Sequence, residues 1–176
     1  MPTARSLETR TPLGFGMTSG VPSPDLKGHI HSSVIVSLLL GLDQFTKAWV
    51  SAAMLPGQSI PLVSSILHLT YVQNTGAAFG LFKNQQPVFI GFSLLVIGWI
   101  LWEICTRVQM GWRLRWANAL VLAGAIGNLI DRLCLGYVVD FIDFRVWPVF
   151  NVADSAITIG VSCLLIEWWL EQSRHR

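Results

Sequence analysis

Charged residues are scarce in this sequence. Asp, Glu, Lys and Arg together make up 12% of the 176 residues, whereas a soluble domain typically has about 25%. Hydrophobic residues reach 52%, and the formal net charge is only +2. A charge this small gives no reason to expect nucleic-acid binding, and the composition as a whole indicates an integral membrane protein of one domain.

Cysteine pairs and the common catalytic motifs are also missing. The three cysteines, Cys105, Cys134 and Cys163, form no CxxC pair, so neither a disulfide framework nor a thiolate metal site is indicated. The four histidines form no HExxH zinc motif, and the chain has no GxSxG nucleophile elbow. Because GxGxxG and P-loop motifs are absent too, we expect no cofactor and no metal ion.

What the sequence does have is four long apolar segments. Each has roughly the 20 residues that an α-helix needs to cross a bilayer core, and they lie at about 32–55, 87–105, 114–133 and 149–170. Residues 1–28 are rich in Pro, Gly, Ser and Thr, which predicts a disordered tail and not a secretory signal peptide. Met17 is a second candidate start within this tail, and residues 173–176 form a short C-terminal tail.

The distribution of Lys and Arg predicts how these helices are oriented. With the N-terminus inside, most basic residues fall on the cytoplasmic side: Arg5, Arg10, Lys27, Arg107, Arg113, Arg115, Arg174 and Arg176. The outer side then carries Lys47, Lys83, Arg132 and Arg145. We therefore predict that both termini are cytoplasmic.

Two segments on the outer side have the pattern of β-strands. In "ILHLTYVQ" the apolar residues Leu67, Leu69 and Tyr71 alternate with polar ones, which predicts a short strand or hairpin, and "NTGAAFG" predicts a turn around Gly76 and Gly80. The segment "GYVVDFIDFRVWPVF" is also strand-like, and in a strand its aspartates, Asp140 and Asp143, face opposite ways. The predicted fold is an all-α membrane protein with four transmembrane helices and a small extracytoplasmic β-cradle.

Several aspartates lie near the outer membrane level in this topology. Ionisable groups are costly there and indicate function unless they have a structural role. Asp43 and Lys47 are spaced as a self-neutralising helical pair, or as support for a site. Asp131 ends a helix, where the dipole disfavours a carboxylate, so it needs a partner such as Arg132 or another donor. Asp143 has a structural partner two residues on, in Arg145.

Asp154 has two interpretations. Asn151 can cap the last helix, and a carboxylate at Asp154 then complements the helix dipole. Alternatively, Asp154 forms a pair with Asp140, which lies at the same membrane level beside an apolar surface. Two carboxylates in a low-dielectric site cannot both ionise easily, so one keeps its proton. Such a pair can activate a water molecule against a peptide carbonyl and later protonate the leaving amine.

Five motifs, in order along residues 32–170, carry a resemblance to a known family. They read "DQFTK" (43–47), "VQNTGAAFGLF" (72–82), "GAIGNLIDR" (124–132), "GYVVDFIDF" (136–144) and "FNVADSAI" (150–157). With these motifs the chain resembles the lipoprotein signal peptidase (signal peptidase II) family of bacterial membrane aspartic proteases. The segment between Asp140 and Asp154 is shorter than in many family members, which leaves the length of the outer loop and the substrate preference open.

The resemblance implies a function and a set of site residues. The catalytic dyad would be Asp140 and Asp154, and the surrounding site would contain Asp43, Lys47, Asn74, Gly127, Asn128, Asp131, Arg132 and Asn151. Asn74 would bind the substrate backbone, and Arg132 would support the polar cluster. Residues 29–172 would form the peptidase domain in the bacterial inner membrane, with its active site at the outer face. It would cut prolipoproteins before a diacylglyceryl-modified cysteine, with membrane lipids around it and no nucleic-acid partner; a monomer fits, but the oligomeric state stays open.

Two other classes of function compete with the peptidase. A small proton or ion transporter would use Asp43, Lys47 and Asp131 as a relay, which requires polar residues through the whole membrane depth. A structural or assembly partner would use its aspartates only to cap helices and to pair with arginines, and it would tolerate Asp→Asn changes.

Overall fold

The structure, a computed structural model, describes residues 26–76, 85–107 and 110–174. Within these residues four helices dominate: α1 (Leu26–Ala53), α2 (Gln86–Thr106), α3 (Trp112–Cys134) and α4 (Val152–Arg174). Each is long and apolar enough to cross a bilayer, which confirms the four predicted spans. The first helix begins at Leu26, so residues 26–28 of the predicted tail are helical, and residues 1–25 lie outside the described residues.

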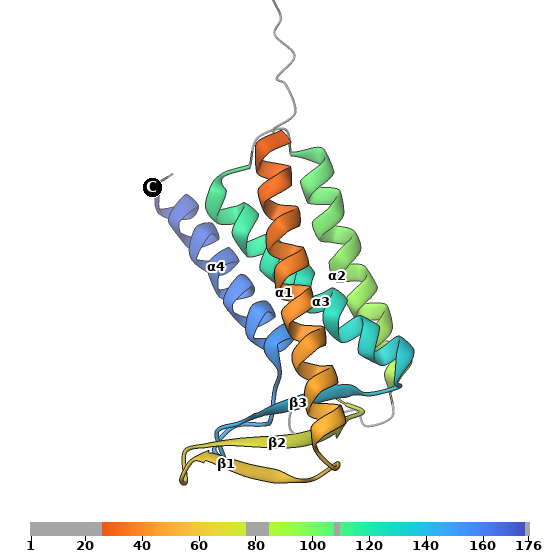
Figure 1. Ribbon diagram of the computed structural model, residues 1–176. Coiled ribbons are helices and arrows are strands. Elements are labelled where there is room, and N and C mark those ends of the chain that lie inside the picture. Colours follow the sequence, from red (N-terminus) through yellow and green to blue (C-terminus); the bar gives the residue numbers. More distant parts are fainter. Residues whose placement is uncertain (1–25, 77–84, 108–109, 175–176) are drawn as a thin grey trace, which may run out of the picture.

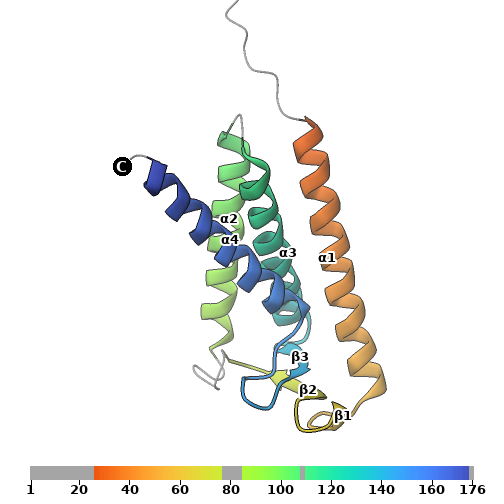
Figure 2. The same cartoon turned by 90° about the vertical axis from the view of Figure 1, so that its left-hand side faces the viewer.

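Helix α3 lies at the centre of the bundle, with the other helices around it (Figure 1 and Figure 2). Of the 18-residue apolar stretch of each helix, 67% is buried inside the protein in α3, compared with 17% in each of the other three helices. The outer faces of those three helices are therefore left for lipid. Small residues bring α3 and α4 close together. A Cβ atom at Gly160 of α4 would meet the Val121 side chain and the Ala117 carbonyl of α3.

A three-stranded antiparallel sheet covers one end of the bundle, while the described chain begins and ends at the opposite end (Figure 1). Its order is β1 (Ser59–Val63), β2 (Leu67–Asn74) and β3 (Val138–Asp143). In the register of β2 with β3, Val72 lies opposite Asp140 and His68 opposite Asp143. The predicted hairpin and outer strand are therefore confirmed; Gly80 of the predicted turn lies outside the described residues.

The last helix begins at Val152, three residues later than the predicted span. Residues before it instead fold back on β3, where Phe150 donates its backbone N–H to the Ile142 carbonyl at 3.1 Å and Ile142 donates to Phe150 at 2.8 Å. Arg145 takes a left-handed backbone conformation (φ 66°) in the turn between them. This short return places the start of α4 directly beside the strand that carries Asp140.

Candidate active site

Asp140 lies on β3 and is 1% exposed. Two side-chain amides hold it: Asn74 Nδ2 donates to Oδ2 at 2.8 Å, and Asn151 Nδ2 donates to Oδ1 at 2.7 Å. Burial, and then the negative charge of Asp154, raise the pKa of Asp140 from 3.8 to about 7. At neutral pH this carboxyl group therefore holds its proton for a substantial fraction of the time, and it can act as an acid.

Asp154 occupies the first turn of α4, where it and Asn151 cap each other. The Asp154 N–H donates to Asn151 Oδ1 at 2.8 Å, and the Asn151 N–H donates to Asp154 Oδ2 at 3.3 Å. Asn128 on α3 donates its Nδ2 to the other oxygen, Oδ1, at 2.7 Å. The predicted cap is confirmed, and it leaves Asp154 lining the same cavity as Asp140.

Both carboxylates line one cavity of about 640 Å³. Asn74 and Arg132 add polar groups to its wall, and Arg132 lies over the Phe89 ring at 5.1 Å. The rest of the lining is mostly apolar and comes from the turn after β3 and from α4: Phe144, Trp147, Pro148, Val149, Phe150, Ile157 and Ile159. Two carboxylates beside such a wall lie in a low-dielectric environment, which disfavours ionisation of both at once.

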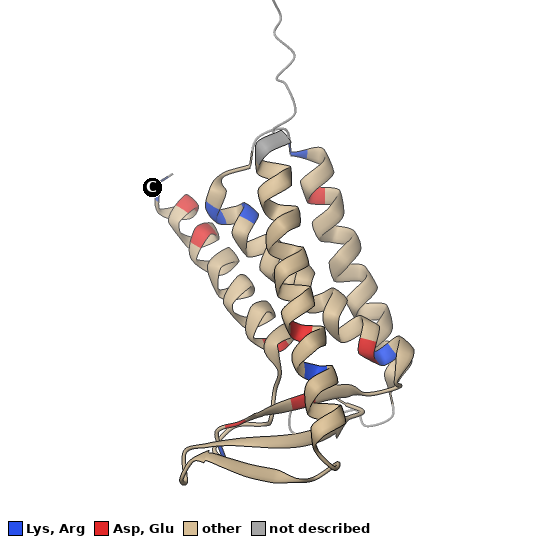
Figure 3. Ribbon diagram, viewed as in Figure 1, with Lys and Arg blue, Asp and Glu red and all other residues tan. Residues whose placement is uncertain are grey.

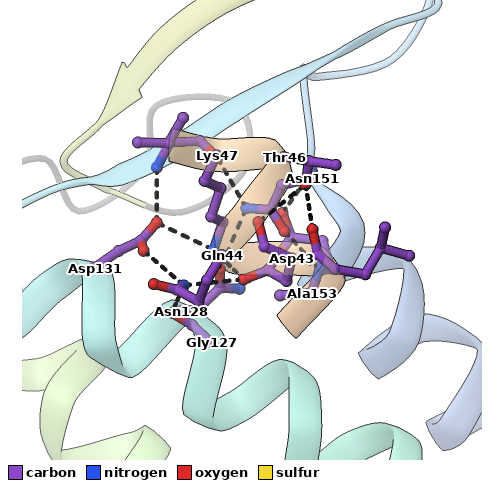
Figure 4. A network of polar contacts seen from close by, with 12 residues as sticks. Asp43, Gln44, Thr46, Lys47, Gly127, Asn128, Asp131, Asn151 and Ala153 are labelled. Atoms are coloured by element: carbon purple, nitrogen blue, oxygen red, sulfur yellow. Dashed lines mark hydrogen bonds and ion pairs between the residues drawn. The ribbon is translucent and has the colours of Figure 1, made fainter. Parts of the chain in front are cut away.

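Lys47 on α1 is the centre of a polar network next to Asp154 (Figure 4). Its ammonium group is 2.9 Å from Asp43 Oδ2, 3.0 Å from Asp131 Oδ2 and 2.9 Å from Asn128 Oδ1. The predicted pair of Asp43 with Lys47 is thus confirmed. The pair is also connected to Asp154, since Asn128 contacts both Lys47 and Asp154.

The two aspartates of this network tie four elements of the fold together. Asp131 on α3 accepts a hydrogen bond from the backbone N–H of Val139 on β3 at 3.1 Å, and Asp43 on α1 accepts one from the Ala153 N–H on α4 at 2.9 Å. Asp131 thus has the partner that its position demanded. That partner is Lys47, together with the Val139 N–H, and not the adjacent Arg132, whose Nη1 donates to the Asn128 carbonyl at 3.4 Å.

Gln44 is a site residue that the sequence interpretation missed. Its Nε2 lies 3.2 Å from Asp43 Oδ2, 3.2 Å from the Gly127 carbonyl and 3.1 Å from Asp131 Oδ1. Its place within "DQFTK", beside Asp43, was the available signal. Gly127 lets the two helices approach here, because a Cβ atom at that position would meet Asp43 Oδ2.

Asp143 faces away from the dyad, as the strand alternation predicts. Thr70 Oγ1 donates to its Oδ2 at 2.7 Å, and Arg145 donates from its backbone N–H at 2.8 Å and from Nη1 at 3.2 Å. Burial alone would raise the pKa of Asp143, but these hydrogen bonds and the Arg145 charge outweigh it and hold the pKa below its ordinary value. The expected pairing of Asp143 with Arg145 is confirmed.

Comparison with known proteins shows the family to which the chain belongs. The family model described as signal peptidase (SPase) II matches residues 35–170. The chain belongs to the signal peptidase II family. It is 41% identical over 139 residues to the lipoprotein signal peptidase of Halothermothrix orenii, covering 79% of this chain and 95% of that one. It is 47% identical over 137 residues to that of Moorella thermoacetica, covering 78% and 90%.

Two solved structures are similar to this chain in fold. A structure described as a bacterial membrane enzyme matches with a TM-score of 0.79 and 31% identity, covering 83% of this chain and 92% of that chain. A second structure with the same description matches with a TM-score of 0.72 and 32% identity, covering 78% and 92%. The fold of these bacterial membrane enzymes is therefore shared by most of this chain.

At the other end of this signal peptidase II bundle lies a buried polar pair that sequence reasoning also missed. Glu103 on α2 is 6% exposed and accepts a hydrogen bond from Asn118 Nδ2 on α3 at 3.1 Å. Arg107 Nε lies 3.0 Å from the second Glu103 oxygen. The pair ties α2 to α3 at the end of the bundle opposite the sheet.

Proposed function

We propose that this chain is an aspartic endopeptidase that removes signal peptides from lipid-modified prolipoproteins, cutting before the lipidated cysteine. The observation that carries the proposal is the shared cavity of Asp140 and Asp154, with an amide network that holds both carboxylates in place. Membership of the signal peptidase II family and the lipoprotein signal peptidases among the relatives support the substrate class.

The chemistry follows from one proton shared by two carboxylates. The ionised carboxylate takes a proton from water, and the water oxygen attacks the scissile carbonyl carbon. The protonated carboxyl polarises that carbonyl, and a proton is returned to the amine as the C–N bond breaks. No covalent intermediate forms on the protein, and the carboxyl groups supply every proton transfer.

The cavity suits a substrate that is both peptide and lipid. Its apolar wall, from Trp147 to Phe150 and along α4, offers a surface for acyl chains next to the carboxylates. Asn74 Nδ2 carries two N–H donors; one holds Asp140, and the other is assigned to a substrate carbonyl. Arg132 on the same wall supplies a fixed positive charge beside the reacting groups.

The orientation in the membrane follows from the charges. Figure 3 shows charged residues near the two ends of the bundle and few between them. The end away from the sheet carries basic residues that include Arg107, Arg113 and Arg115, which the positive-inside rule places in the cytoplasm. The dyad and the sheet then lie at the outer face, where a lipid-anchored precursor presents its cleavage site.

Proton or ion transport is not favoured. A relay needs polar groups through the full membrane depth, and the Lys47 network lies at the sheet end of the bundle (Figure 1 and Figure 4). The Glu103 and Asn118 pair lies at the opposite end, where it is closed by Arg107.

The decisive experiment is cleavage of a lipid-modified precursor by the purified protein in detergent or vesicles. Asp140→Asn and Asp154→Asn are each expected to lower the rate roughly 10²–10⁴-fold. Asp143→Asn is the matched control, since it makes the same change on the same strand facing the other way, and it is expected to cleave normally. Normal processing by either dyad variant would refute the aspartic mechanism.

A further inference from the structure

The Lys47 ammonium uses its whole hydrogen-bonding capacity inside the protein. An ammonium group has three N–H donors and no acceptor, and it lies within 3.0 Å of three acceptors, the carboxylates of Asp43 and Asp131 and Asn128 Oδ1. Lys47 is 3% exposed, so water does not compete for these donors. Two of the contacts are to carboxylates, which together more than balance its single positive charge. The third is to Asn128, the residue that contacts Asp154.

That third contact fixes the direction of the Asn128 side chain. An ammonium group attracts the amide oxygen and repels the amide N–H groups, so Asn128 cannot turn its Nδ2 toward Lys47. Asn151 Nδ2 donates to the same oxygen at 3.2 Å. Asn128 Nδ2 is therefore obliged to face Asp154, where it donates to Oδ1 at 2.7 Å. A donor held in this direction favours a charged carboxylate over a neutral one.

We propose that Lys47 is a positioning residue for the reaction: through Asn128 it keeps Asp154 ionised, so that Asp154 activates the water and Asp140 supplies the proton. The inference rests on the proposed function and adds an assignment of roles within the dyad. The charged groups around Asp154 are Asp140 on β3, Arg132 on α3 and Lys47 on α1, with Asp43 and Asp131 behind Lys47.

Two features distinguish the two carboxylates, and the pKa of Asp140 is consistent with them. Asp140 is 1% exposed whereas Asp154 is half-buried, and the more deeply buried acid loses more hydration on ionising. Asp154 lies in the first turn of α4, where the helix dipole stabilises a negative charge. The pKa of Asp140, raised by burial and by the charge of Asp154 to about 7, agrees with Asp140 as the proton donor.

The test is the pH profile of kcat/KM for precursor cleavage, whose acid limb reports loss of the base and whose alkaline limb reports loss of the acid. Lys47→Gln removes the cation, and Asn128→Ala removes the relay while leaving both ion pairs of Lys47 intact. Each change is expected to move the acid limb up by about one pH unit or more. Asn128→Ala should leave the alkaline limb in place, whereas Lys47→Gln should raise it by less than the acid limb, because the Lys47 charge also lowers the pKa of Asp140. Arg107→Gln, which removes a cation from the opposite end of the bundle, is the control and should move neither limb.

Two results would overturn the proposal. If Lys47→Gln and Asn128→Ala lower kcat equally at every pH with the wild-type limbs, Lys47 only supports the fold. If the alkaline limb moves in their place, the roles of Asp140 and Asp154 are reversed. If Lys47→Gln fails to fold, the pH profile of Asn128→Ala tests the proposal by itself. Failure of the proposed function is separate from both results, because it would appear as normal cleavage by Asp140→Asn or Asp154→Asn.

Discussion

Asn151 and Asp154 cap each other: each donates its backbone N–H to a side-chain oxygen of the other, at 3.3 Å and 2.8 Å. The same Asn151 side chain donates from Nδ2 to Asp140 Oδ1 at 2.7 Å. One residue therefore starts the last helix and contacts both carboxylates. The cap uses Asn151 Oδ1 and its backbone N–H, whereas the contact with Asp140 uses Nδ2. A substitution that keeps a capping oxygen but removes the amide therefore separates helix capping from support of the proposed dyad.

Asn151→Ala should lower both stability and activity. Loss of the cap is expected to cost about 1 kcal/mol, and loss of the Nδ2 donor leaves Asp140 with only Asn74 as an amide partner. Asn151→Ser keeps a capping oxygen but lacks an amide that reaches Asp140, so it should recover most of the stability and little of the activity. Thermal unfolding in detergent and precursor cleavage measure the two effects. Full activity in the Ser variant would show that the Asn151–Asp140 contact is dispensable.

The pKa of Asp140 predicts how stability depends on pH. Its pKa is about 7 in the folded protein and near 3.8 in the unfolded chain, so the folded state binds this proton more tightly. The resulting stabilisation is complete below about pH 4 and is lost as the pH rises through about 7. The unfolding temperature of the wild type should therefore fall across this window. Asp140→Asn should remove this part of the dependence, and an identical curve for the variant would contradict the assignment.

Cleavage should lose rate over the same alkaline range. Above about pH 7 Asp140 is ionised, so the dyad no longer has a proton with which to polarise the carbonyl or to release the amine. We expect kcat/KM to fall about tenfold for each pH unit above this value. A rate that stays constant to pH 9 in folded protein would exclude Asp140 as the acid.

Local patterns predicted much of this site. Alternation in "ILHLTYVQ" predicts β2, and the odd spacing between Asp140 and Asp143 predicts that they face opposite ways, because side chains alternate along a strand. The spacing of Asp43 and Lys47 predicts their ion pair, since residues four apart are neighbours on a helix. Each of these predictions depends on backbone geometry within one element, and each is confirmed.

Contacts between elements could not be predicted in the same way. Lys47 pairs with Asp131 as well as Asp43 only because α1 packs on α3 at Gly127, and nothing in the local sequence indicates that approach. The partners of Gln44 and the pairing of Glu103 with Asn118 likewise depend on which helix faces are in contact. The late start of α4 depends on the bridge between Ile142 and Phe150, which is tertiary too.

Asp143 should show a pH dependence of the opposite sign to Asp140. Its pKa is held below the ordinary value by Thr70 and Arg145 despite burial, so it stabilises the fold above about pH 4 and loses this effect as the pH falls. Asp143→Asn should cost about 1 kcal/mol at neutral pH and flatten the acid side of the stability curve. Unfolding temperatures between about pH 3 and 7 test this; a variant as stable as the wild type throughout would show that the Asp143 interactions contribute nothing.

Gly127→Ala should disturb the Lys47 network where α1 packs on α3. A Cβ atom at Gly127 would lie 2.5 Å from Asp43 Oδ2 and 3.4 Å from Ala153 Cβ, so either the Asp43 carboxylate shifts within the Lys47 network or α1 moves away from α3. Overpacking of this kind costs about 1–3 kcal/mol, and displacement of Asn128 behind Asp154 is expected to slow cleavage by up to about a hundredfold. Gly98→Ala on α2 is the matched control. A Cβ atom there has no neighbour within 4 Å, so the control should keep wild-type cleavage and gain about 0.5–1 kcal/mol from helix propensity. If both alanine variants cleave at the wild-type rate, close contact at Gly127 is not required to align the dyad.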